Sequence, residues 1–333
     1  MKKNELIYTD FSEIRKLITD ARRRAFKAVN SELINLYWEI GKYISEKIES
    51  SQWGNKTIDQ LADFIKIKEP NIKGFERRNL YRMKQFYETY KDNEIVTPLV
   101  TQLPWTHNLI IFSRCKNSEE RKFYLNLTVK EKYTKRELDR QINSGIFERT
   151  MLADVKLTTP LREIAPESKS IFRDSYVFEF LELPKVHSES DLKRALILYL
   201  KDFIIEIGRD FTFIGQEYRL QVGNSDFFID LLFFHRELQC LVVFELKIDK
   251  FKPEYLGQLE FYLEALDRTV RKTHENPSIG ILLCRDKDDE VVEFALNRSL
   301  SPALIAEYKT KLIPKEILRQ KLNEFYEILE KKE

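Results

Sequence analysis

Two carboxylates and one lysine lie in apolar runs where a buried strand would ordinarily carry no charge. Asp230 is inside the run Phe227–Phe234, and Glu245 and Lys247 are near the end of the run Leu241–Lys247. Both runs are rich in β-branched and aromatic residues, which is typical of buried strands. A carboxylate is costly to bury unless it meets a cation or a metal ion. These three side chains are therefore the first candidates for chemistry.

The short connector between the two runs, His235–Gln239, predicts a hairpin with its midpoint near Glu237. Antiparallel pairing then sets Asp230 opposite or diagonal to Glu245, and directly opposed Cβ atoms lie about 5 Å apart. Lys247 points to the same face as Glu245, because successive strand residues alternate. Two carboxylates this close repel unless a divalent cation lies between them, and oxygen ligands suit Mg²⁺ or Mn²⁺.

The Asp…Glu-x-Lys arrangement resembles the PD-(D/E)xK nuclease superfamily. A closer match, to the YhcG-type family of bacterial PD-(D/E)xK proteins, is carried in order by the segments Val222–Arg236, Cys240–Lys247 and Pro253–Tyr262. The resemblance extends along nearly the whole chain. It implies an α/β fold with a restriction-endonuclease-like αβββαβ core and a mixed sheet. It also implies Mg²⁺- or Mn²⁺-dependent nuclease activity.

Phosphodiester hydrolysis needs a positioned water and relief of the negative charge that builds up on the phosphate. A metal ion held by Asp230, Glu245 and the Leu246 carbonyl would lower the pKa of that water and bind a phosphate oxygen. Lys247 would orient or deprotonate the water, or stabilise negative charge. The alternative is a buried Asp–Lys–Glu salt bridge without catalysis. Such bridges are expensive, so catalysis is the favoured interpretation.

Gln258 and Tyr262 are four residues apart in the helix expected after the Glu-x-Lys strand, so they share a face. They resemble the Q-x-x-x-Y motif of one branch of the superfamily. By that resemblance Gln258 orients the scissile phosphate or Lys247, and Tyr262 donates to a phosphate oxygen. Ordinary helix packing is the alternative, above all for Tyr262.

Three more acids are candidates for accessory roles. Asp226 has the same parity as Asp230, and Glu217 is on the preceding strand. Many members of the superfamily carry an acid on the first core helix. Here that helix offers Lys193 near its start and Glu206 near its end. Lys193 stands where the family resemblance implies Glu, which argues against a second metal held by this helix.

Upstream, a basic helix is predicted from Phe75 to Tyr90, after a short helix from Thr57 to about Lys66. The joining segment contains Pro and Gly, which is compatible with a helix-turn-helix or winged-helix-like domain. Residues 73–91 hold six Lys or Arg against two Glu, a surplus of +4, whereas the whole chain has a net charge of only +2. This basic helix has two interpretations. It either lies against the phosphate backbone of a nucleic acid, or it is an amphipathic helix whose charged face is in solvent. The candidate nucleic-acid contacts are Arg77, Arg78, Arg82 and Lys84.

A long helix is predicted from Ser12, a plausible N-cap, to about Glu49. It needs a partner along most of its length, which bundle packing or a homo-oligomer would supply.

Farther on, Trp105 and His107 precede an apolar helix (Leu109–Phe112). One interpretation is that they contact a nucleic acid. The favoured interpretation is that Pro104 fixes the start of the helix and Trp105 packs against it. Two further helices, Ser118–Lys132 and Thr134–Ser144, complete an α-helical domain.

Three segments follow from these patterns: a helical recognition domain (1–149), a connector (150–187) with a short strand or helix around Tyr176–Leu183, and a nuclease domain (188–333). The last is expected to contain, in order, a helix (Asp191–Ile207), a strand (Thr212–Leu220), the two strands already described, a helix (Pro253–Asp267), a strand (Ser278–Cys284), a helix (Glu290–Leu296), a strand (Ala303–Lys309) and a helix (Lys315–Lys331).

Composition narrows the compartment and the class of protein. The chain has 333 residues, 43% hydrophobic and 33% charged, and no apolar run approaches the ~18 residues of a membrane helix. It begins without a signal-like apolar stretch, and its three cysteines are widely spaced. These features predict a cytoplasmic protein without a membrane partner.

The preferred function is a metal-dependent nuclease acting on DNA, with RNA not excluded, whose N-terminal domain recognises substrate or partner. The alternative is a nucleic-acid-binding or regulatory module, associated with toxin or defence systems, that keeps the nuclease fold and acts through a protein partner. A transposon- or recombination-associated enzyme would share the chemistry and differ in the structure of its substrate.

Overall fold

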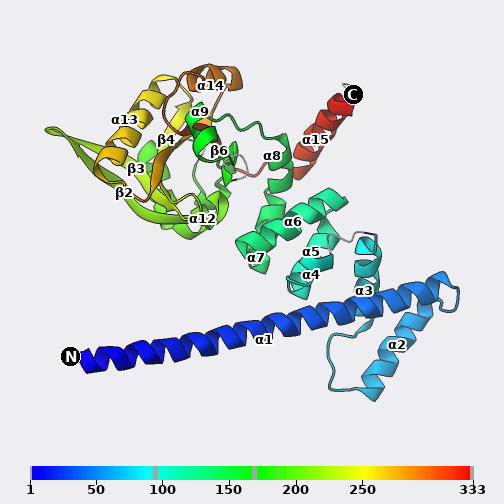
Figure 1. Ribbon diagram of the computed structural model, residues 1–333. Coiled ribbons are helices and arrows are strands. Elements are labelled where there is room, and N and C mark those ends of the chain that lie inside the picture. The colour runs from blue at the N-terminus through cyan, green and yellow to red at the C-terminus, as the bar shows by residue number, and fades with distance from the viewer. Residues whose placement is uncertain (1, 93–96, 167–170, 185, 331–333) are drawn as a thin grey trace. The chain divides into compact units, whose positions relative to one another are not determined.

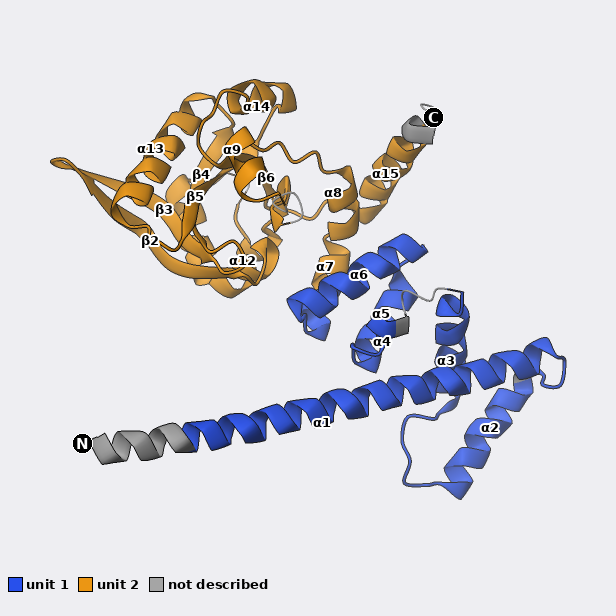
Figure 2. Ribbon diagram, viewed as in Figure 1, with its two compact units in different colours: residues 1–139 blue, residues 140–333 orange. Residues whose placement is uncertain are grey.

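The computed structural model describes residues 2–92, 97–166, 171–184 and 186–330. It divides into two compact units, residues 1–139 and residues 140–333, which are coloured separately in Figure 2. The division falls inside helix α7 (Lys135–Asn143).

The first unit is helical, as expected. Its described residues, 2–92 and 97–139, contain no strand, so the winged-helix alternative, which needs a β-hairpin, is wrong for this part of the chain. Figure 1 shows its helices, which are α1 (Lys2–Glu49), α2 (Asn55–Lys68), α3 (Arg77–Tyr90), α4 (Thr97–Val100), α5 (Trp105–Arg114) and α6 (Ser118–Glu131).

Helix α1 is longer than predicted. It begins at Lys2, so Ser12 lies inside the helix and is not its N-cap. The second half of α1 packs on α3: the ring of Trp38 lies edge-on to those of Phe86 and Tyr87, with centroids 5.7 and 5.1 Å away. Gly41 makes this approach possible, because a Cβ there would lie 2.2 Å from the Met83 carbonyl oxygen.

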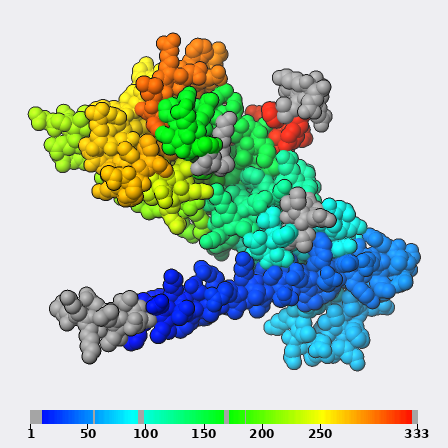
Figure 3. Space-filling view, viewed as in Figure 1, coloured from blue at the N-terminus to red at the C-terminus, as the bar shows by residue number. Residues whose placement is uncertain are grey.

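The first half of α1 keeps its apolar side chains exposed. Leu17, Phe26 and Val29 are 65%, 69% and 67% exposed. The space-filling view shows this part of the helix extending beyond the other helices of its unit (Figure 3). Among the described residues of the first unit, therefore, packing partners are found only along the second half of α1.

Trp105 and His107 form the start of α5 and are packed in the first unit, as favoured from the sequence. Pro104 is the N-cap residue of this helix. The Trp105 ring contacts those of Tyr37 and Phe86, and the buried His107 Nε2 lies 2.9 Å from the Tyr133 carbonyl oxygen. These contacts support the packing interpretation of Trp105 and His107 over contact with a nucleic acid.

The second unit is built on a six-stranded mixed sheet in the order β1-β6-β5-β4-β3-β2. Pairing is antiparallel for β2–β3 and β3–β4, and parallel for β4–β5, β5–β6 and β1–β6. The expected core with a mixed sheet is confirmed. The strands are β1 (Ser175–Val177), β2 (Phe211–Val222), β3 (Ser225–His235), β4 (Cys240–Lys250), β5 (Asn276–Asp286) and β6 (Ala303–Lys309).

Helices cover the sheet and close the unit. The one predicted from Asp191 to Ile207 is two helices, because the backbone of Tyr199 (φ −105°, ψ 33°) interrupts it. The helices are α8 (Ile146–Leu152), α9 (Thr159–Ile164), η1 (Glu179–Leu181), α11 (Glu189–Leu198), α12 (Leu200–Ile207), α13 (Glu254–Thr269), α14 (Asp289–Leu296) and α15 (Lys315–Glu330).

The segment 150–187, expected to be a connector, contributes to the folded core of the second unit. Ser175–Val177 forms β1, which pairs in parallel with β6, and Leu157 bridges to Leu304. Phe172 and Tyr176 are at most 1% exposed. Their apolar surface is buried against the sheet, so the segment is held by the same hydrophobic effect as the rest of the core.

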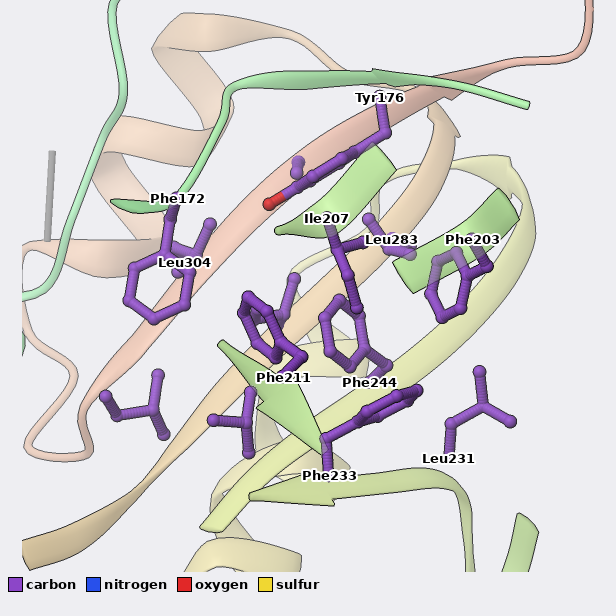
Figure 4. Close-up of a cluster of buried hydrophobic side chains, with 14 of the residues drawn as sticks. Phe172, Tyr176, Phe203, Ile207, Phe211, Leu231, Phe233, Phe244, Leu283 and Leu304 are labelled. Carbon is purple, nitrogen blue, oxygen red and sulfur yellow. The ribbon is translucent and has the colours of Figure 1, made fainter. Parts of the chain in front are cut away.

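Two apolar clusters lie on opposite faces of the sheet, and β4 supplies both in alternation. Val242 and Phe244 belong to the cluster that contains Phe203 and Phe233 (Figure 4). Leu241 and Val243 belong to the other cluster, which includes Leu259 and Tyr262 of α13. By the same alternation, Glu245 and Lys247 lie on the face of β4 that is directed toward α13.

None of the described helices is both long enough and apolar enough to cross a membrane. The three cysteines all lie in the described part of the chain, are buried, and form no disulfide.

Candidate active site

The hairpin of β3 and β4 brings Asp230 and Glu245 to the same level. Its register pairs His235 with Cys240 and continues to Leu231 with Phe244, which is the last pair of this ladder. Asp230 and Glu245 are the first residues beyond it. The predicted register is therefore confirmed, and the two carboxylates lie where the strands cease to pair.

Both oxygens of the Asp230 carboxylate accept hydrogen bonds. Oδ2 accepts from the backbone N–H of Leu246 at 2.9 Å, and Oδ1 accepts from Lys193 Nζ at 3.0 Å. The Asp230 side chain is only 8% exposed. Asp230 is thus held on one side by β4 and on the other by α11.

Glu245, unlike Asp230, has a carboxylate oxygen without a hydrogen-bond donor in the described part of the chain. Its Oε1 accepts from Lys247 Nζ at 2.9 Å, whereas its buried Oε2 has no hydrogen-bond partner among the described residues. Burial and the nearby charge of Asp230 raise the pKa of Glu245 to about 7, against the opposing charge of Lys247. A buried carboxylate oxygen without a donor is a ready ligand for a cation.

Lys247 remains a charged donor in this environment. Burial alone would lower its pKa, but the charge and hydrogen bond of Glu245 outweigh burial, so the pKa of Lys247 is raised. Its Nζ also lies over the ring of Tyr255, 5.4 Å from the centroid. The arrangement favours charge stabilisation by an ammonium group over deprotonation of water by a neutral amine.

Gln258 and Tyr262 of α13 are joined to each other. Gln258 Nε2 donates to Tyr262 Oη at 2.8 Å, and the tyrosine ring is buried in the cluster under α13. Burial raises the pKa of Tyr262, with contributions from the charges of Glu245 and Asp230. The tyrosine therefore packs, as its alternative interpretation held, and its hydroxyl lies in the field of the two site acids.

Glu217 of β2 lies beside Asp230 of the neighbouring strand β3. It stands between the pairs Gln216–Leu231 and Tyr218–Ile229, and its backbone has φ +44°, an uncommon value for a residue with a side chain. Its Oε1 is 3.9 Å from Lys193 Nζ, so it joins the cluster through that lysine.

Asp226 and Glu206, the other accessory candidates, lie elsewhere. Asp226 is near the tip of the β2–β3 hairpin and forms a 2.8 Å ion pair with Arg219. Glu206 is fully buried at the end of α12 and binds arginines: Arg140 and Arg149 donate to it at 3.0 and 3.2 Å. The accessory assignment of Glu206 is wrong because its carboxylate neutralises this arginine cluster.

The structure also adds two residues to the site. Glu189 lies one turn before Lys193 on α11, 3.9 Å from its Nζ, and its charge bears on Glu245 and Lys247. The predicted helix began two residues too late to include it. Ser188 and Asp191 form a capping box, and this Ser-x-x-Asp pattern could have set the start at Glu189. Nothing in the sequence singled out Tyr255, the other addition.

The residues present fit a divalent metal ion. The described residues contain no group of three or more His, Cys, Asp or Glu side chains able to hold one. Two carboxylates completed by a backbone oxygen do not require such a group, and hard oxygen donors are what Mg²⁺ and Mn²⁺ prefer. The buried Oε2 of Glu245 provides the open acceptor.

The basic residues of α3 line a surface hollow of the first unit of about 600 Å³. Two of them are already neutralised: Arg77 pairs with Asp59 and Lys84 with Glu88, each at 2.7 Å. Within the described residues, Arg78 and Arg82 form no ion pair, so these two retain charge for an anionic ligand.

Comparison with known proteins identifies two families along the chain. The family described as "DUF1016 N-terminal domain" matches residues 13–149, and that described as "YhcG PDDEXK nuclease domain" matches residues 169–323. A protein of Escherichia coli (strain K12), "Putative nuclease YhcG", is 33% identical over 352 residues, which cover 94% of this chain and 93% of that protein.

Solved structures match only part of the chain. A repair endonuclease from Pyrococcus abyssi shares 17% identity at a TM-score of 0.26, over 39% of this chain and 50% of the other. An EndoMS–dsDNA complex shares 21% identity at a TM-score of 0.25, over 36% and 48%. The chain thus spans about half the length of these structures, and likeness at this level carries no argument about function.

Proposed function

From the premise that this chain belongs to the YhcG family of PDDEXK nuclease-domain proteins, we propose that it is a metal-dependent nuclease that hydrolyses phosphodiester bonds of DNA. One observation carries the proposal. Beyond the last pair of the β3–β4 ladder, two nearly buried carboxylates lie at the same level, and one of their oxygens has no partner among the described residues. A structural salt bridge would satisfy that oxygen, whereas a cation site requires it to be open.

In this proposal Asp230, Glu245 and the Leu246 carbonyl hold Mg²⁺ or Mn²⁺. A divalent ion bound there supplies activation of water and neutralisation of phosphate charge. The chain's own groups do the rest. The Leu246 N–H fixes Asp230, and Lys247 holds Glu245 in place and presents a charged donor to the phosphate.

The roles of Gln258 and Tyr262 follow from their bond to each other. Because the Gln258 amide donates to Tyr262 Oη, the tyrosine hydroxyl keeps its own proton free to donate. We assign that proton to a non-bridging phosphate oxygen, and we assign Gln258 the orientation of the hydroxyl. Both positions are on α13, whose core contacts hold them against the sheet.

The test compares Glu245→Ala and Lys247→Ala with the full chain on DNA in Mg²⁺ or Mn²⁺. Cleavage is expected to disappear in both variants while circular dichroism and melting temperature show a retained fold. Glu237→Gln, at the far turn of the same hairpin, is the matched control and is expected to cleave normally. Activity that persists in both site variants contradicts the assignment.

The chemistry of the site does not by itself distinguish DNA from RNA as the substrate. We favour DNA, and the same assay across duplex, branched and single-stranded DNA and RNA substrates measures the preference. A chain that cleaves only RNA would leave the site assignment standing and overturn the substrate. The reducing cytoplasm, where buried cysteines without disulfides are expected, is the compartment that this proposal implies.

A second candidate function is a regulatory module that acts through a partner. The exposed apolar face of α1 favours it, because Leu17, Phe26 and Val29 are each more than half exposed. The partner that we propose is a second copy of the chain, whose α1 would present the same apolar repeat. Sedimentation of the full chain tests this: a dimer that Phe26→Glu converts to a monomer supports it, and a monomeric wild type contradicts it.

A further inference from the structure

Strands β3 and β4 separate at the proposed site and continue in different pairs. The ladder between them ends beside Asp230 and Glu245. On one side of this point β3 continues beside β2 to the turn at Gly223, and on the other side β4 continues beside β5 to Lys250. The two branches form a fork, with Asp230 on one branch and Glu245 on the other. A substrate phosphate bound at the site lies within reach of both branches.

The branch made by β2 and β3 is a two-stranded arm, residues 216–230, that projects beyond α13 and the rest of the sheet (Figure 1). One face of the arm packs on α13. Leu220 and Ile229 are buried in the apolar cluster of that helix, and the ring of Phe227 lies 4.6 Å from that of Phe261. This face is therefore part of the folded core and unavailable to a ligand.

The opposite face of the arm bears an exposed aromatic ring. Because side chains alternate along a strand, Phe228 points away from the side taken by Phe227 and Ile229. It points to the side on which α11 contacts Asp230. Phe228 is 53% exposed and makes no ring contact with any described residue. An apolar ring is thus presented to solvent on the same strand as a proposed catalytic acid.

The charged side chains of this face are already paired. Arg219, the ladder partner of Phe228, forms a 2.8 Å ion pair with Asp226. Glu217 lies 3.9 Å from Lys193 Nζ. These residues leave no surplus of positive charge on the arm with which to bind a phosphate. The part of a nucleic acid that suits such a surface is the flat, uncharged face of a base, on which aromatic side chains stack.

The position of Phe228 relates it to one base in particular. It is two residues from Asp230, a separation of about 7 Å along a strand. A phosphate held at Asp230 therefore brings the adjoining nucleotide within reach of the Phe228 ring. In a paired duplex the faces of that base are covered by its neighbours in the stack, and unstacking is easiest for a base that is mismatched or unpaired.

Resting on the proposed function, we propose that Phe228 stacks on an unpaired base next to the scissile phosphate, so that the enzyme prefers DNA that is unpaired at the cleavage site. Phe228 is in this sense a specificity-determining residue. An unpaired base gains the contact directly, whereas a paired duplex must first unstack a base to gain it.

The experiment measures binding of the full chain to two DNAs in the presence of a chelator, which prevents metal-dependent cleavage. One DNA is a fully paired duplex, and the other is the same duplex with one unpaired nucleotide at its centre. Wild type is compared with Phe228→Ala, Phe228→Leu and Phe228→Trp. Phe294→Ala removes a ring of α14 that is 75% exposed, and is the matched control. Circular dichroism establishes that each variant is folded.

Wild type, Phe228→Trp and Phe294→Ala are expected to bind the DNA with the unpaired nucleotide about tenfold more tightly than the paired duplex, a factor within the range of one base–aromatic stack. Phe228→Ala and Phe228→Leu are expected to bind the two DNAs equally, because neither side chain has a flat aromatic face. In Mg²⁺, kcat/KM for cleavage of the two DNAs should show the same preference and the same dependence on Phe228.

Three outcomes overturn the inference: a wild type that binds both DNAs equally, a preference that survives in Phe228→Ala or Phe228→Leu, and a preference that Phe294→Ala also loses. Cleavage by Glu245→Ala separates these from failure of the proposed function. If Glu245→Ala abolishes cleavage while the Phe228 variants keep the preference, only the role of Phe228 falls. If the preference depends on Phe228 while Glu245→Ala still cleaves, only the catalytic assignment falls. A wild type that binds neither DNA overturns both.

Discussion

Carboxylates of one type are used in opposite ways in this protein, and the difference lies in what surrounds each. Glu245 is buried with one lysine and one open oxygen, and its pKa is raised to about 7. Glu206 is buried as well, but arginines and a backbone N–H surround it. Although burial alone would raise the pKa of Glu206, the charges of these arginines bring it down to about 2. The first is poised for a cation, and the second already has its cations.

The lowered pKa of Glu206 has a consequence for acid stability. A carboxyl whose pKa is lower in the folded chain contributes stability above its unfolded pKa, near 4.5, and loses it as the pH falls toward 2. The contribution is about 3 kcal/mol, from the size of the pKa difference. We therefore expect the free energy of unfolding to drop steeply between pH 5 and pH 2.

Denaturant unfolding across that pH range measures the drop, with Glu206→Gln as the comparison. The variant is expected to be less stable at neutral pH, because it leaves Arg149 and its neighbours without a buried counter-charge. Its stability should then fall less between pH 5 and pH 2 than that of wild type. Parallel curves for the two proteins would contradict this account of Glu206.

At the scale of elements, the site depends on how closely α13 approaches the sheet. Gly280 of β5 lies beneath Leu259 of α13, and a Cβ at position 280 would be 2.7 Å from Leu259 Cγ. Leu259 is fully buried in the apolar cluster between α13 and the sheet. The absence of a side chain on Gly280 therefore sets the spacing between β5 and α13, the helix that carries Gln258 and Tyr262.

Gly280→Ala is expected to destabilise the fold by about 1–3 kcal/mol, as overpacking of a filled core does. Gly257→Ala, on the exposed side of the same helix, is the matched control. A Cβ there meets nothing within 4 Å, so helix propensity is expected to raise stability by about 0.5–1 kcal/mol. Thermal or denaturant unfolding measures both, and equal effects in the two variants would rule out the close packing.

At the scale of the whole molecule, binding and chemistry are expected to reside in different units. The proposed catalytic groups all belong to residues 140–333, whereas the basic helix α3 belongs to residues 1–139. Of its four candidate contacts, Arg78 and Arg82 retain unneutralised charge within the described structure. We propose that these two contact the backbone phosphates of the substrate.

Arg78→Glu combined with Arg82→Glu is accordingly expected to weaken DNA binding without changing the rate of cleavage at saturation. The slope of log affinity against log salt should fall by about one for each phosphate that the protein no longer neutralises. Lys116→Glu with Lys122→Glu, exposed residues of the same unit, makes the same change of charge and is the control. Affinity unchanged in the arginine variant, or equally reduced in the control, would refute the role of α3.

The sequence alone determined the order of elements from β2 to α15 and the pairing of Asp230 with Glu245. Alternation along a strand, helix spacing and the length of a hairpin turn are local properties, and they place residues that are near in sequence. The helical character of the first unit followed from the same periodicity. Two local features escaped it: α1 begins ten residues before the predicted Ser12, and Tyr199 interrupts the first helix of the nuclease core.

Only the tertiary structure decided which distant residues meet. Segment 150–187 joins the sheet through β1 and β6, Lys193 reaches Asp230 from α11, and Glu206 turns to its arginines. Such contacts depend on the burial of apolar surface and the pairing of charges between segments far apart in the chain. The periodicity of the sequence does not contain this information. A helix with an acid at a given position can direct it to a metal site or to an arginine cluster, and only the packing of the helix determines which.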